Sequence, residues 1–255
     1  MAVDGRPEFA FDEVFDDDYL FFYGRHGDPA SRLSDDYAEA DTDKVVAYLG
    51  LEPGASVLDL ACGHGRIANR LARRGFRVTG LDRSTLFLDL ARAHAAEWGI
   101  DIEYVEGDMC SVPWTARFDA VVSWFTSFGY FDDDGNRAVL RGVRAALRDG
   151  GVFVLDVNNL AGVLRQFRPT DLIERDGDFL IDRRWWDAVS GRIETERIVV
   201  RKGRVRRFPF SVRTFTFPEL RQWLVEAGFA SADAFGAPGE PLDLDSRRMV
   251  VIATA

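Results

Sequence analysis

Apolar and polar positions along residues 57–157 follow two alternating patterns. Short apolar runs typical of buried strands recur, and most are followed by segments in which apolar residues return every three or four positions, as on one face of a helix. The runs lie at residues 57–60, 76–81, 102–105, 118–123 and 152–157. This alternation predicts a parallel sheet with right-handed crossovers, whose ligand lies beyond the carboxyl ends of the strands.

A different pattern begins near residue 178. Extended segments at 179–186, 192–200 and 204–215 are separated by the hairpin signals Ser190-Gly191 and Lys202-Gly203. We therefore expect a small three-stranded antiparallel insertion at about residues 178–216, placed over the carboxyl edge of the sheet where it can wall a substrate pocket. A helix opened by Pro218 and apolar strands at 229–235 and 248–253 complete the pattern.

The N-terminal residues 1–40 combine many aromatic side chains with many carboxylates. The aromatic content is too high for a disordered tail, but its spacing supports only a short helix. Two interpretations stay open: a lid over the active site, or an arm that packs on the core or on a neighbouring subunit of a homo-oligomer. Residues 41–255 form the main domain in either case. The turn-rich loop at 23–29 could place Tyr23 or His26 beside a substrate.

The strand at 57–60 leads into a glycine-containing turn that predicts a cofactor loop. Gly63 and Gly65 permit a sharp bend and a close approach to a ligand, and a helical pattern follows directly. Residues 63–68 formally satisfy the dinucleotide pattern, with Asp82 placed as a ribose-binding acid, so a nicotinamide cofactor fits by that test. Asp59, four residues before Gly63, would repel a pyrophosphate but suits a ligand with a cationic end.

These residues also resemble a known family. Residues 58–65 (LDLACGHG) are similar to motif I of the class I S-adenosylmethionine-dependent methyltransferases, 78–82 to their second strand with its ribose acid, and 107–109 (GDM) to their adenine loop. Residues 118–123 and 147–154 are similar to the fourth strand and the approach to the fifth. The resemblance covers about residues 40–160 closely. It implies a Rossmann-like α/β fold, a seven-stranded mixed sheet with helices on both faces, and S-adenosyl-L-methionine as the cofactor.

The resemblance also implies roles for single residues. Asp59 and the backbone of 61–65 would serve the amino-acid tail of the cofactor, Asp82 the ribose diol, and Asp108 with the Met109 backbone the adenine. Ser123 and Trp124 would stand near the methionine portion. The full set of predicted cofactor-binding residues is Asp59, Ala61, Cys62, Gly63, Gly65, Arg66, Asp82, Arg83, Gly107, Asp108, Met109, Ser123 and Trp124.

The candidate catalytic residues are Tyr23, His26, Phe125 and Tyr130. Phe125 and Tyr130 belong to an aromatic cluster directly after residues 118–123, where aromatic faces would attract a sulfonium or an alkylammonium group. An amine acceptor can lose its proton to solvent, whereas a hydroxyl acceptor ordinarily needs a positioned base, for which Tyr23, His26, Tyr130 and Asp156 are candidates.

Composition narrows the class of partner. The chain has 255 residues and a formal net charge of −10, which disfavours nucleic acid and anionic membrane surfaces and favours a small-molecule substrate. Its two cysteines are too few for a disulfide framework or a cysteine-rich zinc site, and we predict no metal. No apolar run reaches the roughly 18 residues of a membrane span. We expect a cytoplasmic protein.

The sequence therefore predicts an S-adenosylmethionine-dependent methyltransferase that acts on an amine or hydroxyl of a small molecule. N-methylation in metabolite or antibiotic tailoring is the favoured reaction. The alternatives are an NAD(P)-dependent oxidoreductase, supported by the formal glycine pattern, and a non-catalytic binding module of the same fold. Intact acids at positions 59, 82 and 108 argue against the last of these.

Overall fold

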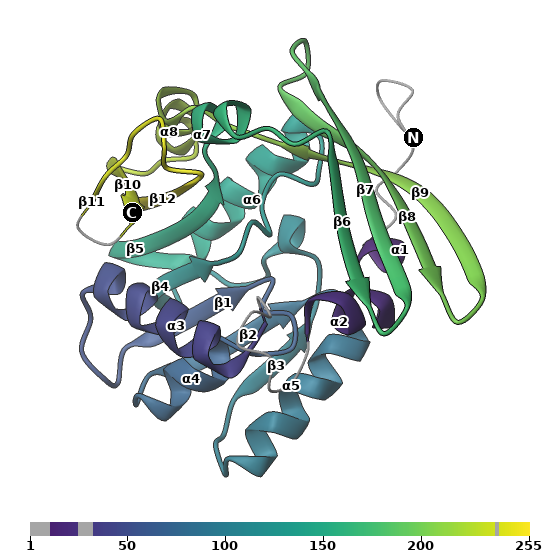
Figure 1. The fold of residues 1–255 in the computed structure, drawn as a ribbon. Coiled ribbons are helices and arrows are strands. Elements are labelled where there is room, and N and C mark those ends of the chain that lie inside the picture. Colours follow the sequence, from purple (N-terminus) through teal and green to yellow (C-terminus); the bar gives the residue numbers. More distant parts are fainter. Residues whose placement is uncertain (1–10, 25–32, 238–239) are drawn as a thin grey trace.

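The larger of two sheets forms the centre of the molecule (Figure 1). The structure is a computed structural model that describes residues 11–24, 33–237 and 240–255. The sheet has the strand order β11-β10-β12-β5-β4-β1-β2-β3, in which β1 to β5 pair in parallel and β12, β10 and β11 are added antiparallel. Its strands are β1 (Ser56–Leu60), β2 (Arg77–Asp82), β3 (Glu103–Glu106), β4 (Phe118–Ser123), β5 (Leu147–Asn158), β10 (Ser231–Ala237), β11 (Glu240–Pro241) and β12 (Arg248–Thr254).

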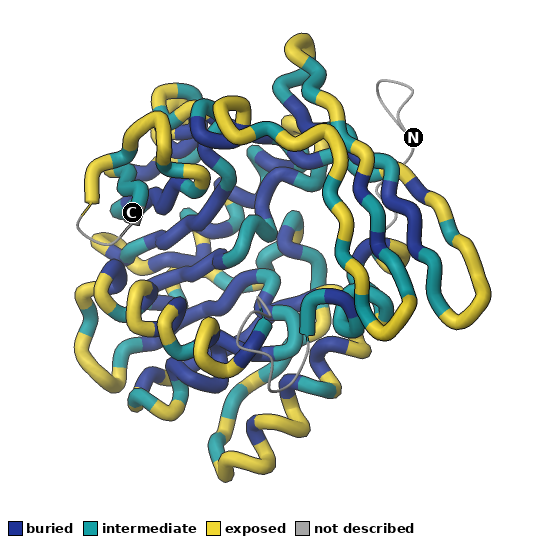
Figure 2. The backbone as a smooth tube through the Cα atoms, viewed as in Figure 1, coloured by how far each residue is buried: buried dark blue, intermediate teal, exposed yellow. Residues whose placement is uncertain are grey.

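Helices cover both faces of this sheet. Consecutive strand residues point to opposite faces, so neighbours in one strand pack in different apolar cores. Val57 of β1 packs in one apolar core with residues of α3 and α4, and its neighbour Leu58 packs in the other with residues of α6 and α8. Figure 2 shows the inner strands buried along most of their length. The helices here are α3 (Asp35–Leu49), α4 (Ala68–Arg73), α5 (Thr85–Glu97), the short 3-10 helix η1 (Met109–Ser111), α6 (Asp133–Ala146) and α8 (Phe217–Glu226). The predicted Rossmann-like α/β fold is confirmed.

The sequence interpretation was wrong in two details of strand number. The two-residue strand β11 pairs with β10 and brings the mixed sheet to eight strands rather than seven. The antiparallel sheet has four strands rather than three, and it begins at residue 170 rather than near 178. Its strands are β6 (Thr170–Arg175), β7 (Asp178–Asp187), β8 (Arg192–Arg201) and β9 (Arg204–Arg213). The charged residues in β6 hid it from an apolar pattern. Pro209, which cannot donate a backbone hydrogen bond, lies on the edge strand β9.

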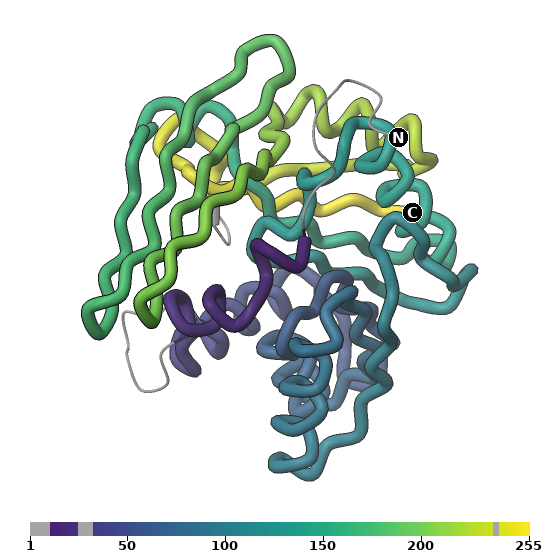
Figure 3. Tube along the Cα trace, turned by 90° about the vertical axis from the view of Figure 1, so that its right-hand side faces the viewer, coloured from purple at the N-terminus to yellow at the C-terminus, as the bar shows by residue number. Residues whose placement is uncertain are grey.

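The N-terminal helices lie against the four-stranded sheet. Figure 3 shows this purple segment running between the green strands and the body of the larger sheet. Its helices are α1 (Phe11–Val14) and α2 (Asp17–Tyr23), and the short helix α7 (Leu160–Arg165) connects β5 to β6. Val14 and Phe22 pack in one small apolar cluster with residues of β7, β8 and β9. None of the helices in the described ranges is long and apolar enough to cross a membrane.

Candidate active site

The turn after β1 is shaped by residues with left-handed backbone. Ala61, Gly63 and Gly65 have φ values of 60°, 53° and 77°. At Gly65 a Cβ atom would lie 2.5 Å from the Tyr104 hydroxyl, so only glycine lets α5 and β3 pack this close to the turn. The Asp82 carboxylate at the end of β2 fixes the turn from the other side, accepting hydrogen bonds from Gly63 N at 2.7 Å and from Ser84 N at 2.8 Å.

Asp59 is a buried carboxylate that faces the same turn. Asp59 is the fourth of the five residues of β1, and its Oδ2 has no hydrogen-bond donor among the described residues. Burial raises the pKa of Asp59 to about 7, opposed by nearby Arg66 and reinforced by Asp82. A buried carboxylate oxygen without a donor is costly, and a cationic group of a ligand would relieve that cost. Asp59 thus fits the ammonium group of S-adenosylmethionine and not a pyrophosphate.

A cavity of about 300 Å³ opens at the carboxyl ends of the parallel strands. It contains most of the predicted cofactor-binding residues, namely Asp59, Ala61, Cys62, Gly63, Arg66, Asp82, Met109 and Trp124, and the candidate catalytic residues Tyr23, Phe125 and Tyr130. Five predicted residues do not line it: Gly65, Arg83, Gly107, Asp108 and Ser123. The candidate His26 lies outside the described residues.

The predicted adenine side borders this cavity rather than lining it. Asp108 accepts a hydrogen bond from Cys110 N at 2.8 Å, and its Oδ2 lies 3.6 Å from Nη1 of Arg83. The Arg83 guanidinium in turn lies 5.5 Å from the ring centre of Phe11 in α1. Met109, directly after Asp108, does line the cavity. Both carboxylate oxygens of Asp108 thus already have neighbouring donors, and each keeps lone pairs for a further one.

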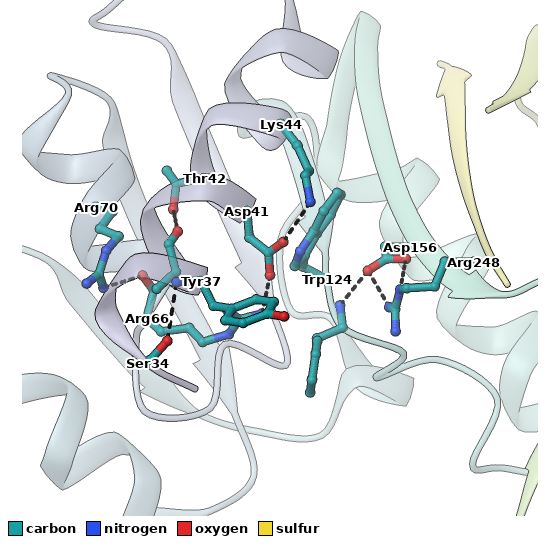
Figure 4. A network of polar contacts seen from close by, with 12 residues as sticks. Ser34, Tyr37, Asp41, Thr42, Lys44, Arg66, Arg70, Trp124, Asp156 and Arg248 are labelled. Atoms are coloured by element: carbon teal, nitrogen blue, oxygen red, sulfur yellow. Dashed lines mark hydrogen bonds and ion pairs between the residues drawn. The ribbon is translucent and has the colours of Figure 1, made fainter. Parts of the chain in front are cut away.

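The segment after β4 has strained backbone at the cavity wall. Phe125 and Thr126 are consecutive non-glycine residues with φ values of 68° and 60°. Asp156 of β5 holds both: its Oδ2 accepts from Phe125 N at 3.0 Å, and its main-chain oxygen accepts from Thr126 N at 3.1 Å. Arg248 of β12 donates to both carboxylate oxygens, with Nε at 2.7 Å from Oδ1 (Figure 4). Asp156 therefore positions this segment and is not available as a base.

Two arginines flank the ring of Phe125. Arg66 and Arg248 place their guanidinium carbons 4.8 Å and 5.4 Å from its centre. Arg66 is itself held by Asp41 of α3, with 2.9 Å between Nη2 and Oδ2 (Figure 4). Sequence reasoning missed Asp41 and Arg248. A signal existed for Asp156, a carboxylate within an apolar strand, but its partner lies 92 residues later.

The antiparallel sheet contributes a buried ion pair to the opposite wall. Arg197 of β8 donates to both oxygens of Asp182 in β7, at 2.7 Å and 2.8 Å, and to the hydroxyl of Tyr23 at 3.1 Å. Its guanidinium also lies 4.9 Å from the ring centre of Phe210. The sequence analysis did not single out Arg197 or Asp182. The pair fixes Tyr23 at the cavity.

Two ionisable groups of the wall are neutral near pH 7. Burial, with Tyr19 adding to it, raises the pKa of Tyr130 well above its usual range. Burial, together with Arg66, His94 and Arg70, lowers the pKa of His64 to about 4. A phenol with a raised pKa is a poor base, and His64 is an imidazole with little affinity for a proton.

Comparison with known proteins agrees with this geometry. Residues 57–151 match a family model described as a methyltransferase domain. A putative methyltransferase of Geobacillus is 29% identical over 73% of this chain and 78% of its own length. A ubiquinone biosynthesis O-methyltransferase of Methylobacterium is 38% identical over 41% of this chain, but only 42% of that protein is spanned.

Solved structures share the fold over nearly the whole chain. The CcbJ methyltransferase of Streptomyces caelestis has a TM-score of 0.76 at 24% identity, with 96% of each chain covered. The sugar N-methyltransferase KedS8 of Streptoalloteichus has a TM-score of 0.65 at 20% identity, covering 100% of this chain and 98% of its own.

The fold, the Asp59 and Asp82 geometry and the domain match identify the chain as a class I S-adenosylmethionine-dependent methyltransferase. The predicted enzyme class and cofactor are confirmed. The formal glycine pattern for a dinucleotide was the weaker indicator, since the buried Asp59 carboxylate opposes a pyrophosphate at this turn.

Proposed function

We propose that this enzyme methylates an amine nitrogen of a small polar molecule. The observation that carries the proposal is that Asp156, Tyr130 and His64 are unsuited to act as a base, while Asp59 and Asp82 face the proposed cofactor. Asp156 is held by Arg248 and by Phe125 N, and the pKa values of Tyr130 and His64 are shifted away from those of a neutral-pH base. A hydroxyl acceptor would need such a base, whereas an amine can reach its neutral form by losing a proton to solvent.

The predicted roles at the cofactor follow the residues that line the cavity. When bound, the cofactor supplies an electrophilic methyl group. Asp59 would accept from its ammonium group, Asp82 from its ribose hydroxyls, and the Met109 backbone would lie along its adenine. Asp82 can do so because each carboxylate oxygen has a lone pair beyond the one used by Gly63 or Ser84. Orienting the two reactants is the main task that remains for the protein.

The acceptor would lie between the strained segment and the four-stranded sheet. Phe125, Tyr130 and Tyr23 meet there, and their ring faces favour an alkylammonium product. In this proposal α1 and α2 act as a lid, because Phe15 and Tyr19 line the cavity from above and would exclude water. The alternative of a subunit contact predicts an oligomer that dissociates when this segment is removed.

One structural neighbour that spans the full chain supports nitrogen as the acceptor atom. KedS8, which shares the fold along the full chain, is described as a sugar N-methyltransferase. The ubiquinone O-methyltransferase relative matches only 42% of its own length, so its acceptor region is not compared. We propose metabolite or antibiotic tailoring as the biological setting of this reaction.

The proposal is tested in two stages. Calorimetric titration with S-adenosylmethionine first establishes binding. Matched amine and alcohol acceptors, for example glucosamine and glucose, are then incubated with protein and cofactor, and methylated products are measured by mass spectrometry. Methylation of amines supports the proposal. Methylation of the alcohols alone, by a protein that binds the cofactor, would overturn it.

A further inference from the structure

A second and larger cavity adjoins the active site. It has a volume of about 560 Å³ and lies between α7 and the four-stranded sheet. Several residues line both cavities, so the second opens directly onto the first. These shared residues are Tyr23, Asn158, Arg184, Arg197, Phe210, Val212 and Arg247. An acceptor whose amine lies at Phe125 can therefore extend its remaining atoms into this chamber.

The charges at the junction of the two cavities have one sign. The charged residues that line both are Arg184, Arg197 and Arg247, and no carboxylate in the described ranges lines both. This contrasts with the formal net charge of −10 of the chain. Asp182 neutralises Arg197 with two hydrogen bonds. Asp171 pairs with Arg184 in the same way, so the junction is distinguished by its guanidinium N–H donors and not by a net charge. Such donors favour an acceptor group, an oxyanion above all, on a ligand.

Arg184 of β7 is only partly satisfied. Its Nη2 donates to Asp171 of β6 at 2.6 Å, but its Nε is buried and has no acceptor among the described residues. Deeper in the chamber, Arg175 has two buried nitrogens, Nε and Nη1, that also lack acceptors. Buried guanidinium N–H groups without acceptors are costly, and an oxyanion is the ligand group that satisfies them in pairs.

Two of the four carboxylates of the chamber offset arginine charge but leave the buried Nε of Arg184 without an acceptor. Asp171 and Asp182 already accept hydrogen bonds from Arg184 and Arg197. Asp176 lies 3.9 Å from Arg175, beyond hydrogen-bond distance, and Glu174 also borders the chamber, away from the junction. These four acids line the chamber but do not line the active-site cavity.

We propose that the acceptor carries an oxyanion, a carboxylate or a phosphate ester, which Arg184 binds at the junction while the amine faces Phe125. This deepens the proposed N-methylation and rests on it for the amine, but the anion site stands on Arg184 and the chamber alone. The site would select acidic amines over neutral amines of the same shape.

Binding of a simple anion tests the site without any acceptor. The protein with bound S-adenosylmethionine is titrated calorimetrically with inorganic pyrophosphate and with citrate. Arg184→Gln should weaken binding by about tenfold or more, because it removes a charge-assisted hydrogen-bond donor. Arg204→Gln, at an exposed position of β9, is the matched control and should leave binding unchanged. Equal binding to wild type and Arg184→Gln, or no binding to wild type, would overturn the proposal.

Matched acceptors distinguish the two sources of the anion. Glucosamine, its 6-phosphate and its uronic acid are compared by kcat/KM. An advantage of about tenfold for one acidic form, reduced in Arg184→Gln and kept in Arg204→Gln, supports the site and names its anion. Equal kcat/KM for all three contradicts it. If no amine is methylated although the cofactor binds, the proposed N-methylation fails, and the pyrophosphate titration still decides the anion site.

Discussion

The two halves of the active site are held in place by different forces. On the cofactor side, β1, β4 and β5 are buried apolar strands, with Leu58, Val121 and Leu155 fully enclosed between helices. On the acceptor side, one small apolar cluster joins the four-stranded sheet to α1 and α2, and arginine–carboxylate pairs provide the other contacts. Apolar burial is non-directional and tolerant, whereas a buried ion pair depends on both partners.

The comparison teaches where each half can vary. A parallel core can keep its cofactor turn while its apolar residues change, provided that volume and pattern are kept. The acceptor half fixes Tyr23 through Arg197 and Asp182, so a single change there moves a residue of the cavity wall. We expect cofactor binding to tolerate conservative changes of apolar core residues, and acceptor choice to be sensitive to single substitutions around Tyr23.

The largest expected effect is loss of the buried ion pair. Asp182→Leu leaves the Arg197 guanidinium buried without its partner and should lower the free energy of unfolding by about 3–5 kcal/mol. The double variant Asp182→Leu/Arg197→Met should recover most of this loss, because two apolar side chains replace the pair. Urea denaturation measures both. If the double variant is as unstable as the single one, the loss does not come from the unpaired Arg197 charge, and this prediction is contradicted.

A second substitution addresses the cofactor half. Asp82→Ala removes the acceptor for Gly63 N and Ser84 N and the proposed ribose contact. S-adenosylmethionine affinity should fall by about 100-fold, as expected for two hydrogen bonds to a charged group. Calorimetry measures the change, with Asp89→Ala, an exposed acid of α5, as the control. An Asp82→Ala protein of wild-type affinity would refute the role given to this residue.

Asp59 provides a pH-dependent version of the same test. Burial raises its folded-state pKa to about 7, above the ordinary value, so its contribution to stability is present below about pH 4 and is lost as pH rises toward 7. A cationic ligand favours the carboxylate, so cofactor affinity should increase by about tenfold between pH 5.5 and pH 7.5, then level off. Calorimetry across this pH range measures the increase in cofactor affinity. In Asp59→Asn the increase should disappear. An increase that persists in this variant would come from the titration of another group.

The sequence predicted the cofactor half well because its signals are local. The apolar runs and the turn at Gly63 and Gly65 lie within a few residues of one another, and Asp59 lies in the same stretch. The pair formed by Asp182 and Arg197 depends instead on the register of β7 against β8, in which they lie directly opposite. A shift of the register by one residue would turn either side chain to the other face of the sheet. The hairpin signals in the sequence predict a turn but not the exact register of the two strands.

Long-range partners were beyond prediction for the same reason. Asp156 was visible as an acid in an apolar strand, but Arg248 reaches it only because β12 pairs with β5. The strand β6 was missed because charged residues occupy it, of which Asp171 and Arg175 are half-buried and Glu174 is exposed. Chemistry that depends on sheet register thus stays hidden until the fold is known.

Asp156→Asn tests the segment at Phe125 and Thr126, which lies between the cofactor half and the acceptor half of the site. The change keeps the shape but removes the charge that Arg248 binds, which weakens the support for left-handed backbone at Phe125 and Thr126. Turnover should fall by about tenfold with a smaller change in cofactor affinity, since misplacing a reacting group costs rate. Steady-state kinetics with a methylated amine and calorimetry separate the two effects. Asp149→Asn, a fully exposed acid, is the control, and equal losses in both quantities would point to general unfolding.

The smallest effect is expected at the surface pairs that hold α2. Burial alone would raise the pKa of Asp18, but hydrogen bonds from Arg201 and Arg206 outweigh it and lower that pKa, so the carboxylate is charged at neutral pH. Asp18→Asn should reduce turnover about two- to fivefold and mimic the effect of high salt on wild type, because partly exposed pairs contribute little and are screened. Asp17→Asn, far more exposed, should have less effect.

Deleting residues 1–22 should lower turnover more than cofactor affinity if the segment is a lid. Unchanged turnover, with a dimer lost in sedimentation, would make the segment a subunit contact.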